Sequence, residues 1–289
     1  MKNAEKQSKI QLIASMCIFG TISLFVRNIA LPSSVVALVR GVLGTIFLLA
    51  VLALRHQRLD LAAIRNNFWI LAVSGGVMGF NWALLFEAYR YTTVATATLC
   101  YYMAPVFMIL AAPVVLREKL SLRRGLCALA AFCGMVLISG VVGGGIPQGG
   151  ELRGILLGLG AAVLYATVIL LNKKLRDIGA YDKTIVQLAA AAVVLLPYCL
   201  ATEHVTFANL SALGLVCLLV LSFFHTGFAY AMYFGSMKAL RAQTVAIFSY
   251  IDPVVAIILS VAVLREPFSA MSAAGSALIL GAAFVSEKS

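Results

Sequence analysis

The chain has 289 residues, of which 62% are hydrophobic and 11% are charged, and its mean hydropathy is +1.01. A soluble domain of this length cannot bury so much apolar surface, so the composition excludes the soluble classes and indicates a protein that lies in lipid. The net charge of +11 does not indicate a nucleic-acid partner, because the basic residues lie in short runs between apolar stretches.

The six cysteines all fall inside apolar stretches and lack the spacing of zinc ligands. We interpret them as free thiols that face lipid or neighbouring helices, rather than as disulfides or a metal site. The sequence predicts no cofactor and no metal.

Apolar stretches of about 20 residues, the length of a helix that crosses the hydrocarbon core, follow one another along the chain. The ten predicted spans are residues 10–30, 35–54, 68–89, 94–115, 122–142, 153–172, 182–201, 211–233, 243–264 and 269–286. Lipid offers backbone groups no partner outside their own helix, so we predict an all-α integral membrane protein with ten transmembrane helices. No small-residue cleavage site follows the first span, which we therefore expect to be an uncleaved helix.

The basic residues predict the orientation of these spans. With the N-terminus in the cytoplasm, 17 of the 22 Lys and Arg residues lie in cytoplasmic segments, four lie outside, and Arg40 lies within a span. Cytoplasmic loops carry such an excess. The sequence thus predicts a multi-pass protein of the cell membrane, the inner membrane in a bacterium, with both termini in the cytoplasm.

Polar residues in the first half of the chain are candidates for substrate contact. Arg40 can either reach the outer headgroups by snorkelling or meet a substrate carboxylate. Asn81 and Trp82 lie past the middle of the third span. Asn81 can bond a substrate carboxylate or amine, or else a neighbouring helix, and Trp82 can line a cavity or pack against lipid or a neighbouring helix. Glu87 stands three residues before Arg90, and we expect an ion pair between them.

The fourth and ninth spans each contain a proline near mid-membrane, Pro105 and Pro253. Proline removes an amide donor and weakens the helix, so we predict hinges at both positions. The residues that precede these hinges are expected to border a central cavity, and they are Tyr101, Tyr102, Ser249 and Tyr250.

The sixth and eighth spans add three candidates. Tyr165 and Tyr230 can supply stacking faces and hydroxyls to a small polar or aromatic substrate. His225 can either relay protons or remain a neutral imidazole bonded to a backbone carbonyl.

Asp252 is the sharpest candidate because it lies ten residues into a 22-residue span. A charge at this depth costs about 2.5–3.5 kcal/mol on insertion scales, so the side chain should face the bundle interior. Beside the weakened helix at Pro253, it can hold a proton, a sodium ion or a substrate ammonium group. The alternative is a structural acid that bonds neighbouring helices.

The chain contains an internal repeat. Val115-Leu116-Arg117-Glu118 recurs 148 residues later as Val263-Leu264-Arg265-Glu266, and each copy follows its proline by the same distance. The same or a slightly smaller offset aligns further pairs of residues, which are Phe19 with Tyr165, Arg40 with Gln187, Tyr102 with Tyr250, and Ala104 with Asp252. The predicted organisation is a cytoplasmic N-terminus (1–9), a first repeat (10–142), a Gly-rich linker (143–152) and a second repeat (153–286). Five helices is an odd number, so the second repeat must enter the membrane inverted.

These motifs resemble those of a known family. Tyr250-Ile251-Asp252-Pro253-Val254 with Leu264-Arg265-Glu266, and Tyr102-Met103-Ala104-Pro105-Val106 with Leu116-Arg117-Glu118, are similar to the EamA branch of the drug/metabolite transporter superfamily. The resemblance covers about residues 10–286. It implies secondary transport of small metabolites without ATP, most often export of amino acids, through a central cavity between the two repeats.

We therefore predict a secondary active transporter that works by alternating access and exports small metabolites such as amino acids, with Asp252 as the coupling acid. The expected partners are a small-molecule substrate, a proton or another cation, and the lipid bilayer, and one chain should suffice as a monomer. The alternative is an exporter of organic cations or drugs. We expect no enzyme and no catalytic residue, because the chain has neither paired membrane aspartates nor a His-Glu-x-x-His or Gly-x-Ser-x-Gly motif.

Overall fold

A computed structural model describes residues 2–115, 122–138, 149–203, 210–237, 240 and 248–287, and every regular element in these ranges is a helix. The first half contains α1 (Lys2–Gly20), α2 (Ile22–Val26), α3 (Ser33–Leu54), α4 (Leu61–Asn66), α5 (Phe68–Tyr91), α6 (Val94–Tyr101), α7 (Ala104–Val115) and α8 (Leu122–Ile138). The second half contains α10 (Gly150–Asn172), α11 (Ala180–Thr202), α12 (Ala212–Leu219), the π-helix η2 (Val220–Phe228), α13 (Ala229–Met237), α15 (Ile251–Ala262) and α16 (Ala270–Glu287).

Among the described residues, six helical stretches are long and apolar enough to cross a membrane, and four shorter apolar helices lie in the remaining predicted spans. Large apolar side chains cover the outside of the bundle, where Trp69, Leu122 and Leu200 are 78%, 82% and 77% exposed. Such side chains lose nothing when they face lipid, but together they would form unfavourable patches in water.

Two predicted spans of the first half are interrupted. The first span divides at Thr21, whose hydroxyl donates to the carbonyl of Ile18 at 2.7 Å. The fourth span divides at Tyr102 and Met103, just before Pro105, so the proline stands in the first turn of α7, where its missing amide hydrogen is tolerated. Hydropathy alone does not reveal such breaks, because both parts of each span are apolar.

Helix α10 begins inside the predicted linker. The linker was expected to extend to residue 152, but α10 already begins at Gly150. Its first turn carries Glu151, a favourable residue beside the positive end of the helix dipole, which a hydropathy count assigns to a loop. Residues 143–148 of the predicted linker lie outside the described residues, as does Arg117-Glu118 of the first motif.

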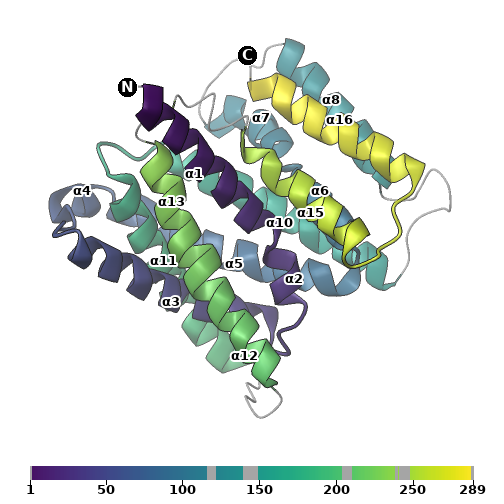
Figure 1. Ribbon diagram of the computed structural model, residues 1–289. Helices are drawn as coiled ribbons and strands as arrows, with labels where there is room; N and C mark the ends of the chain where they lie inside the picture. The colour runs from purple at the N-terminus through teal and green to yellow at the C-terminus, as the bar shows by residue number, and fades with distance from the viewer. Residues whose placement is uncertain are drawn as a thin grey trace.

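The two halves of the chain are interleaved (Figure 1). Helix α5 packs between α10 and α11, α3 packs against α11 and η2, and α1 packs against α13 and α15. Helices α8 and α16 lie side by side at one edge of the bundle in Figure 1. Most of the larger contacts therefore join a helix of the first half to a helix of the second.

Glycines permit the closest of these contacts. A Cβ atom on Gly75 of α5 would lie 2.5 Å from the carbonyl oxygen of Gln187 in α11. Likewise, a Cβ on Gly134 of α8 would lie 2.7 Å from the carbonyl oxygen of Gly275 in α16. Small residues at crossing points let membrane helices approach closely and gain packing energy.

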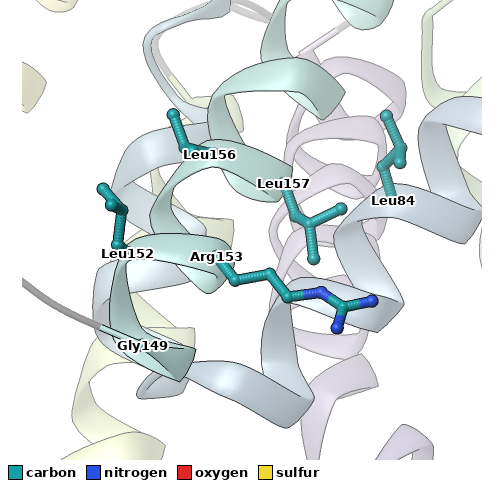
Figure 2. A pocket seen from close by; sticks show the side chains of 6 residues that line it. All are labelled: Leu84, Gly149, Leu152, Arg153, Leu156 and Leu157. Carbon is teal, nitrogen blue, oxygen red and sulfur yellow. The ribbon is translucent and has the colours of Figure 1, made fainter.

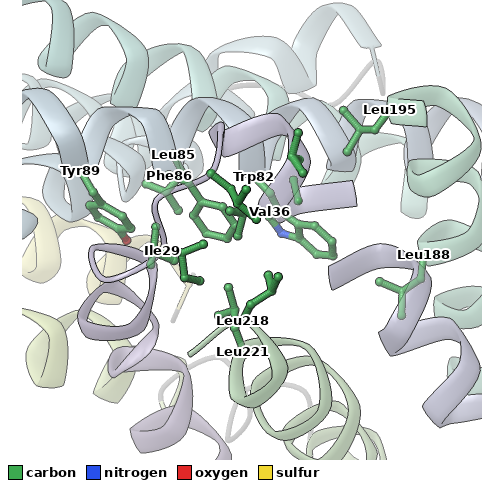
Figure 3. Close-up of a cluster of buried hydrophobic side chains, with 14 of the residues drawn as sticks. Ile29, Val36, Trp82, Leu85, Phe86, Tyr89, Leu188, Leu195, Leu218 and Leu221 are labelled. Carbon is green, nitrogen blue, oxygen red and sulfur yellow. The ribbon is translucent and has the colours of Figure 1, made fainter. Parts of the chain in front are cut away.

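The largest buried cluster lies between α3, α5, α11 and η2. Figure 3 shows Trp82, Leu85 and Phe86 projecting from α5 toward Leu218 and Leu221. This cluster fixes α5 against its neighbours, and it fixes the rim of the cavity described next.

Candidate functional site

A cavity of about 420 Å³ lies between helices of both halves. Its walls come from α1, α2, α3, α5 and the α6–α7 segment of the first half, and from α10, α11, α13 and the start of α15 in the second. The predicted site residues that line it are Asn81, Trp82, Tyr101, Tyr102, Tyr165, Tyr230, Ser249, Tyr250 and Asp252. A volume of this size accommodates a small metabolite.

The residues that the repeat aligns meet in this cavity. Both members of four pairs line it, and the pairs are Phe19 with Tyr165, Arg40 with Gln187, Tyr102 with Tyr250, and Ala104 with Asp252. The internal repeat in the sequence thus corresponds to one shared space in the structure.

Asp252 lies in the first turn of α15. The phenol of Tyr102 donates a hydrogen bond to its Oδ2 at 3.0 Å, which links the first half of the chain to the acid of the second. Gly20 lets α1 pack closely against the start of α15, because a Cβ there would lie 2.7 Å from the carbonyl oxygen of Asp252. The acid therefore stands at a three-helix junction on the cavity wall.

Arg40 also lines the cavity, and only 3% of the residue is exposed. Its Nε donates to the hydroxyl of Thr226 at 2.5 Å, and its Cζ lies 4.2 Å from the centre of the Trp82 ring and 5.7 Å from that of Phe86. Snorkelling to the headgroups, one of the two predictions for Arg40, is therefore wrong. The side chain is held inside because Thr226, on the π-helix, and the aromatic rings of α5 offer it partners there.

Amide side chains cross-link the same walls. Asn81 Nδ2 donates to the carbonyl of Ala161 at 2.6 Å, so it combines an interhelical bond with a place on the cavity wall. Gln187 Nε2 donates to Ser74 Oγ at 2.6 Å and to Asn172 Oδ1 at 2.7 Å. Sequence reasoning did not propose Gln187 as a site residue, although its alignment with Arg40 was a usable signal.

Aromatic rings form much of the remaining wall. Tyr101 and Tyr165 stack with centroids 5.1 Å apart, and Phe19 meets Tyr230 edge to face at 5.3 Å. These rings give the cavity apolar faces beside its few charged groups.

His225 is fully buried and is absent from the described cavity lining. Its Nε2 lies 2.8 Å from Thr21 Oγ1, and its Nδ1 lies 3.3 Å from the carbonyl oxygen of Val220. The structure thus matches the second of the two interpretations, an imidazole that bonds the backbone and ties η2 to the break between α1 and α2.

A polar cluster joins the ends of three helices that line the cavity. Arg27 Nη1 lies 2.6 Å from Glu266 Oε1, and Arg27 Nη2 donates to the carbonyl of Thr92 at 3.0 Å. Glu266 Oε2 accepts the amide hydrogen of Val94, the first residue of α6, at 2.8 Å, and the hydroxyl of Ser260 at 2.5 Å. We call these five residues the Arg27–Glu266 cluster.

At the same end, Glu87 Oε2 lies 3.7 Å from Arg90 Nη1, so the predicted ion pair is confirmed. The hydroxyl of Ser33 also donates to Glu87 at 2.7 Å, and Arg90 donates to the carbonyl of Leu31. This end of the bundle is therefore held by several bonds between helices.

A second, shallower pocket lies on the outside between α5 and α10 (Figure 2). Arg153 extends across it toward Leu84 and stacks on Tyr91, with Cζ 4.3 Å from the ring centre. The rest of the lining is Gly149, Leu152, Leu156 and Leu157. This pocket shares no lining residue with the central cavity.

Apolar helices with lipid-facing side chains outside, and a cavity between the two halves lined by aromatic, amide and a few charged side chains, define a multi-pass membrane protein. The model of the EamA-like transporter family matches residues 8–140 and again residues 152–287. The chain therefore belongs to the EamA-like transporter family, within the drug/metabolite transporter superfamily.

The chain is also similar to individual proteins along most of its length. The uncharacterized transporter YxxF of Bacillus subtilis (strain 168) is 31% identical over 251 residues, which cover 86% of this chain and 79% of the relative. Protein RarD of Salmonella typhi is 25% identical over 263 residues, which cover 89% and 86% of the two chains. A protein of known crystal structure has the same fold, with a TM-score of 0.65 and 21% sequence identity. The match covers 97% of this chain and 96% of that protein.

Proposed function

We propose that this protein is a secondary active transporter that exports small metabolites such as amino acids by alternating access. The observation that carries the proposal is the cavity of about 420 Å³ in which repeat-related residues of both halves meet. Two five-helix repeats, inverted within ten spans, can exchange conformations around one fixed site and expose it to each side in turn.

Asp252 is the proposed coupling acid. It is the acidic residue among the described cavity-lining residues, and the Tyr102 phenol contacts it from the other half of the chain. If the acid binds a proton on one side of the membrane and releases it on the other, the Tyr102 bond couples that event to the packing of the two halves. Pro105 and Pro253 stand beside the breaks at Tyr102 and Tyr250, which supports their role as hinges.

The Arg27–Glu266 cluster is proposed to hold the outer side of the cavity shut. The positive-inside rule assigns this end to the outer face of the cell membrane and both termini to the cytoplasm. Opening toward the outside then requires separation of α6 from the ends of α2 and α15, and hence loss of the Arg27–Glu266 bond.

The test is flux into proteoliposomes. Labelled amino acids and a labelled quaternary ammonium compound are offered with and without a pH gradient. The proposal predicts amino-acid uptake that follows the gradient. Uptake of the quaternary ammonium compound alone would instead indicate an exporter of organic cations, and no uptake of any probe would contradict both transport functions.

A further inference from the structure

Arg40 is a buried cation without a carboxylate partner among the described residues. Its only hydrogen bond there runs from Nε to Thr226, and no salt bridge joins it to Asp252, which lines the same cavity. A buried charge is costly in a membrane protein unless a partner or a function compensates. The burial of the Arg40 charge therefore indicates a role beyond packing.

The surroundings of Arg40 prepare it for an anion. The Thr226 hydroxyl donates to the carbonyl of Leu221 at 3.1 Å, so its lone pair accepts from Arg40 and fixes the Nε side of the guanidinium. Trp82 covers one face of the group. The Nη1 and Nη2 donors make no hydrogen bond to described residues, and they lie in the guanidinium plane, where a carboxylate binds through two parallel bonds.

The packing of α3 against η2 supports the position of Arg40 beside Thr226. A Cβ on Gly44, one turn after Arg40, would lie 2.6 Å from the Cγ2 of Thr226. The glycine lets α3 approach η2 closely enough for the Arg40–Thr226 bond. The irregular π-helical backbone of η2 places Thr226 opposite Arg40, and such stretches are frequent at functional sites.

We propose that Arg40 binds the carboxylate of the transported substrate, so that the substrate is a carboxylate-bearing metabolite whose apolar part lies against the aromatic wall. Asp252, bonded to Tyr102, supplies the opposite charge on the same cavity, which makes a zwitterion such as an α-amino acid the best match. This inference rests on the proposed transport function. It also argues against an organic cation, which Arg40 would repel.

The second basic residue on the cavity wall, Lys183, is placed differently. It lies in the first turns of α11, is only half-buried, and carries no aromatic cover that the structure records. Arg40 is instead deep in the bundle between α3, α5 and η2. The carboxylate is therefore assigned to Arg40.

The experiment measures dissociation constants with the purified full chain. The protein has two tryptophans, and Trp69→Phe leaves Trp82, beside Arg40, as the fluorescent reporter of cavity occupancy. Three probes are titrated: phenylalanine, phenylalaninamide, which lacks the carboxylate, and 3-phenylpropionate, which lacks the amine. The variants are Arg40→Gln, Arg40→Lys and the control Arg153→Gln, which removes a stacked arginine outside the cavity.

The proposal predicts that phenylalanine binds at least about tenfold more tightly than phenylalaninamide, the preference expected of charge-assisted hydrogen bonds. Arg40→Gln should abolish this preference and weaken phenylpropionate binding about tenfold. Phenylalaninamide should bind the variant at least as tightly as the wild type, because its ammonium is no longer repelled, and this binding shows that the variant is folded. Arg40→Lys keeps the charge but loses the planar fork, so it should have an intermediate affinity for carboxylates. Arg153→Gln should bind all three probes as the wild type does.

Equal affinity of the wild type for phenylalanine and its amide would overturn the assignment without any variant. So would carboxylate binding that Arg40→Gln leaves unchanged. Binding of the amide but neither carboxylate would overturn the role of Arg40 and leave transport standing. If none of the probes binds and none is taken up by proteoliposomes, both the assignment and the proposed amino-acid transport are contradicted.

Discussion

Asp252 and Arg40 break the symmetry of the repeat at the residue scale. Their aligned partners are Ala104 and Gln187, so each charge of the cavity is carried by one half only. The aromatic and amide residues, by contrast, occur in both halves. A frame of aromatic and amide residues from both halves, with the acid Asp252 and the deeply buried base Arg40 on opposite halves, suits a substrate that carries both charges.

Asp252→Asn should uncouple transport from the pH gradient. Asparagine keeps an oxygen that accepts the hydrogen bond of the Tyr102 hydroxyl, but it cannot bind and release a proton as a carboxylate does. With one proton per substrate, each pH unit drives about tenfold accumulation. We expect the wild type to accumulate labelled amino acid in proteoliposomes and the variant to reach only equilibrium.

Exchange of labelled for unlabelled amino acid is the control, because it needs no gradient. It should persist in Asp252→Asn at saturating amino acid, although the variant lacks the charge that faces the substrate ammonium. Gradient-driven accumulation by the variant at the wild-type level would assign Asp252 a structural role.

The residues of the site were partly predictable. Spacing within the spans and the repeat predicted nine of the residues that line the cavity, because mid-span polar groups must face away from lipid. The inward position of the Arg40 side chain and the burial of His225 were not predictable. Arg40 is bonded to Thr226 and His225 to Thr21, and each partner lies far away in the sequence. Hydropathy carries no information on such pairings.

At the scale of helices, the interruptions lie where the proposed alternating access would require movement. The breaks at Thr21, at Tyr102–Met103 and before α15 all border the cavity. The short helices α4, α6 and α12 each begin with a side-chain cap. Thr93 Oγ1, for example, accepts the amide hydrogen of Thr96 at 3.1 Å at the start of α6. Apolar stretches predicted the spans, but the breaks follow from hydroxyl and proline chemistry within them.

Gly20 is predicted to control the crossing of α1 and α15. A methyl group there would lie 2.7 Å from both the Asp252 carbonyl oxygen and the Val255 Cβ, so Gly20→Ala should lower the free energy of unfolding by about 1–3 kcal/mol and reduce uptake. Gly125→Ala is the matched control, since no atom lies within 4 Å of its added Cβ. That substitution should be neutral or stabilise the helix by up to about 1 kcal/mol.

Denaturation of the purified variants in detergent, together with proteoliposome uptake, measures both effects. If Gly20→Ala were as stable and as active as Gly125→Ala, the close crossing of α1 and α15 would be unnecessary for both stability and transport.

At the scale of the whole molecule, the architecture is one cavity shared by two interleaved halves. Helices of the first half pack mainly on those of the second, so a change in the packing of one half must move the other. The all-helical class and the family were predictable from composition and from the repeat motif. The interleaving was not, because an inverted repeat constrains the orientation of its helices but not which of them become neighbours.

The most direct test of alternating access is the accessibility of the cavity from each membrane face. Ser249, which lines the cavity, is replaced by cysteine in a chain without its native cysteines and treated with an impermeant thiol reagent in right-side-out and inside-out vesicles. The account predicts labelling from both faces and protection by phenylalanine. Glu266→Gln weakens the Arg27–Glu266 cluster by about 1 kcal/mol and should raise labelling from the outer face about fivefold. Labelling from a single face in both backgrounds would contradict the account.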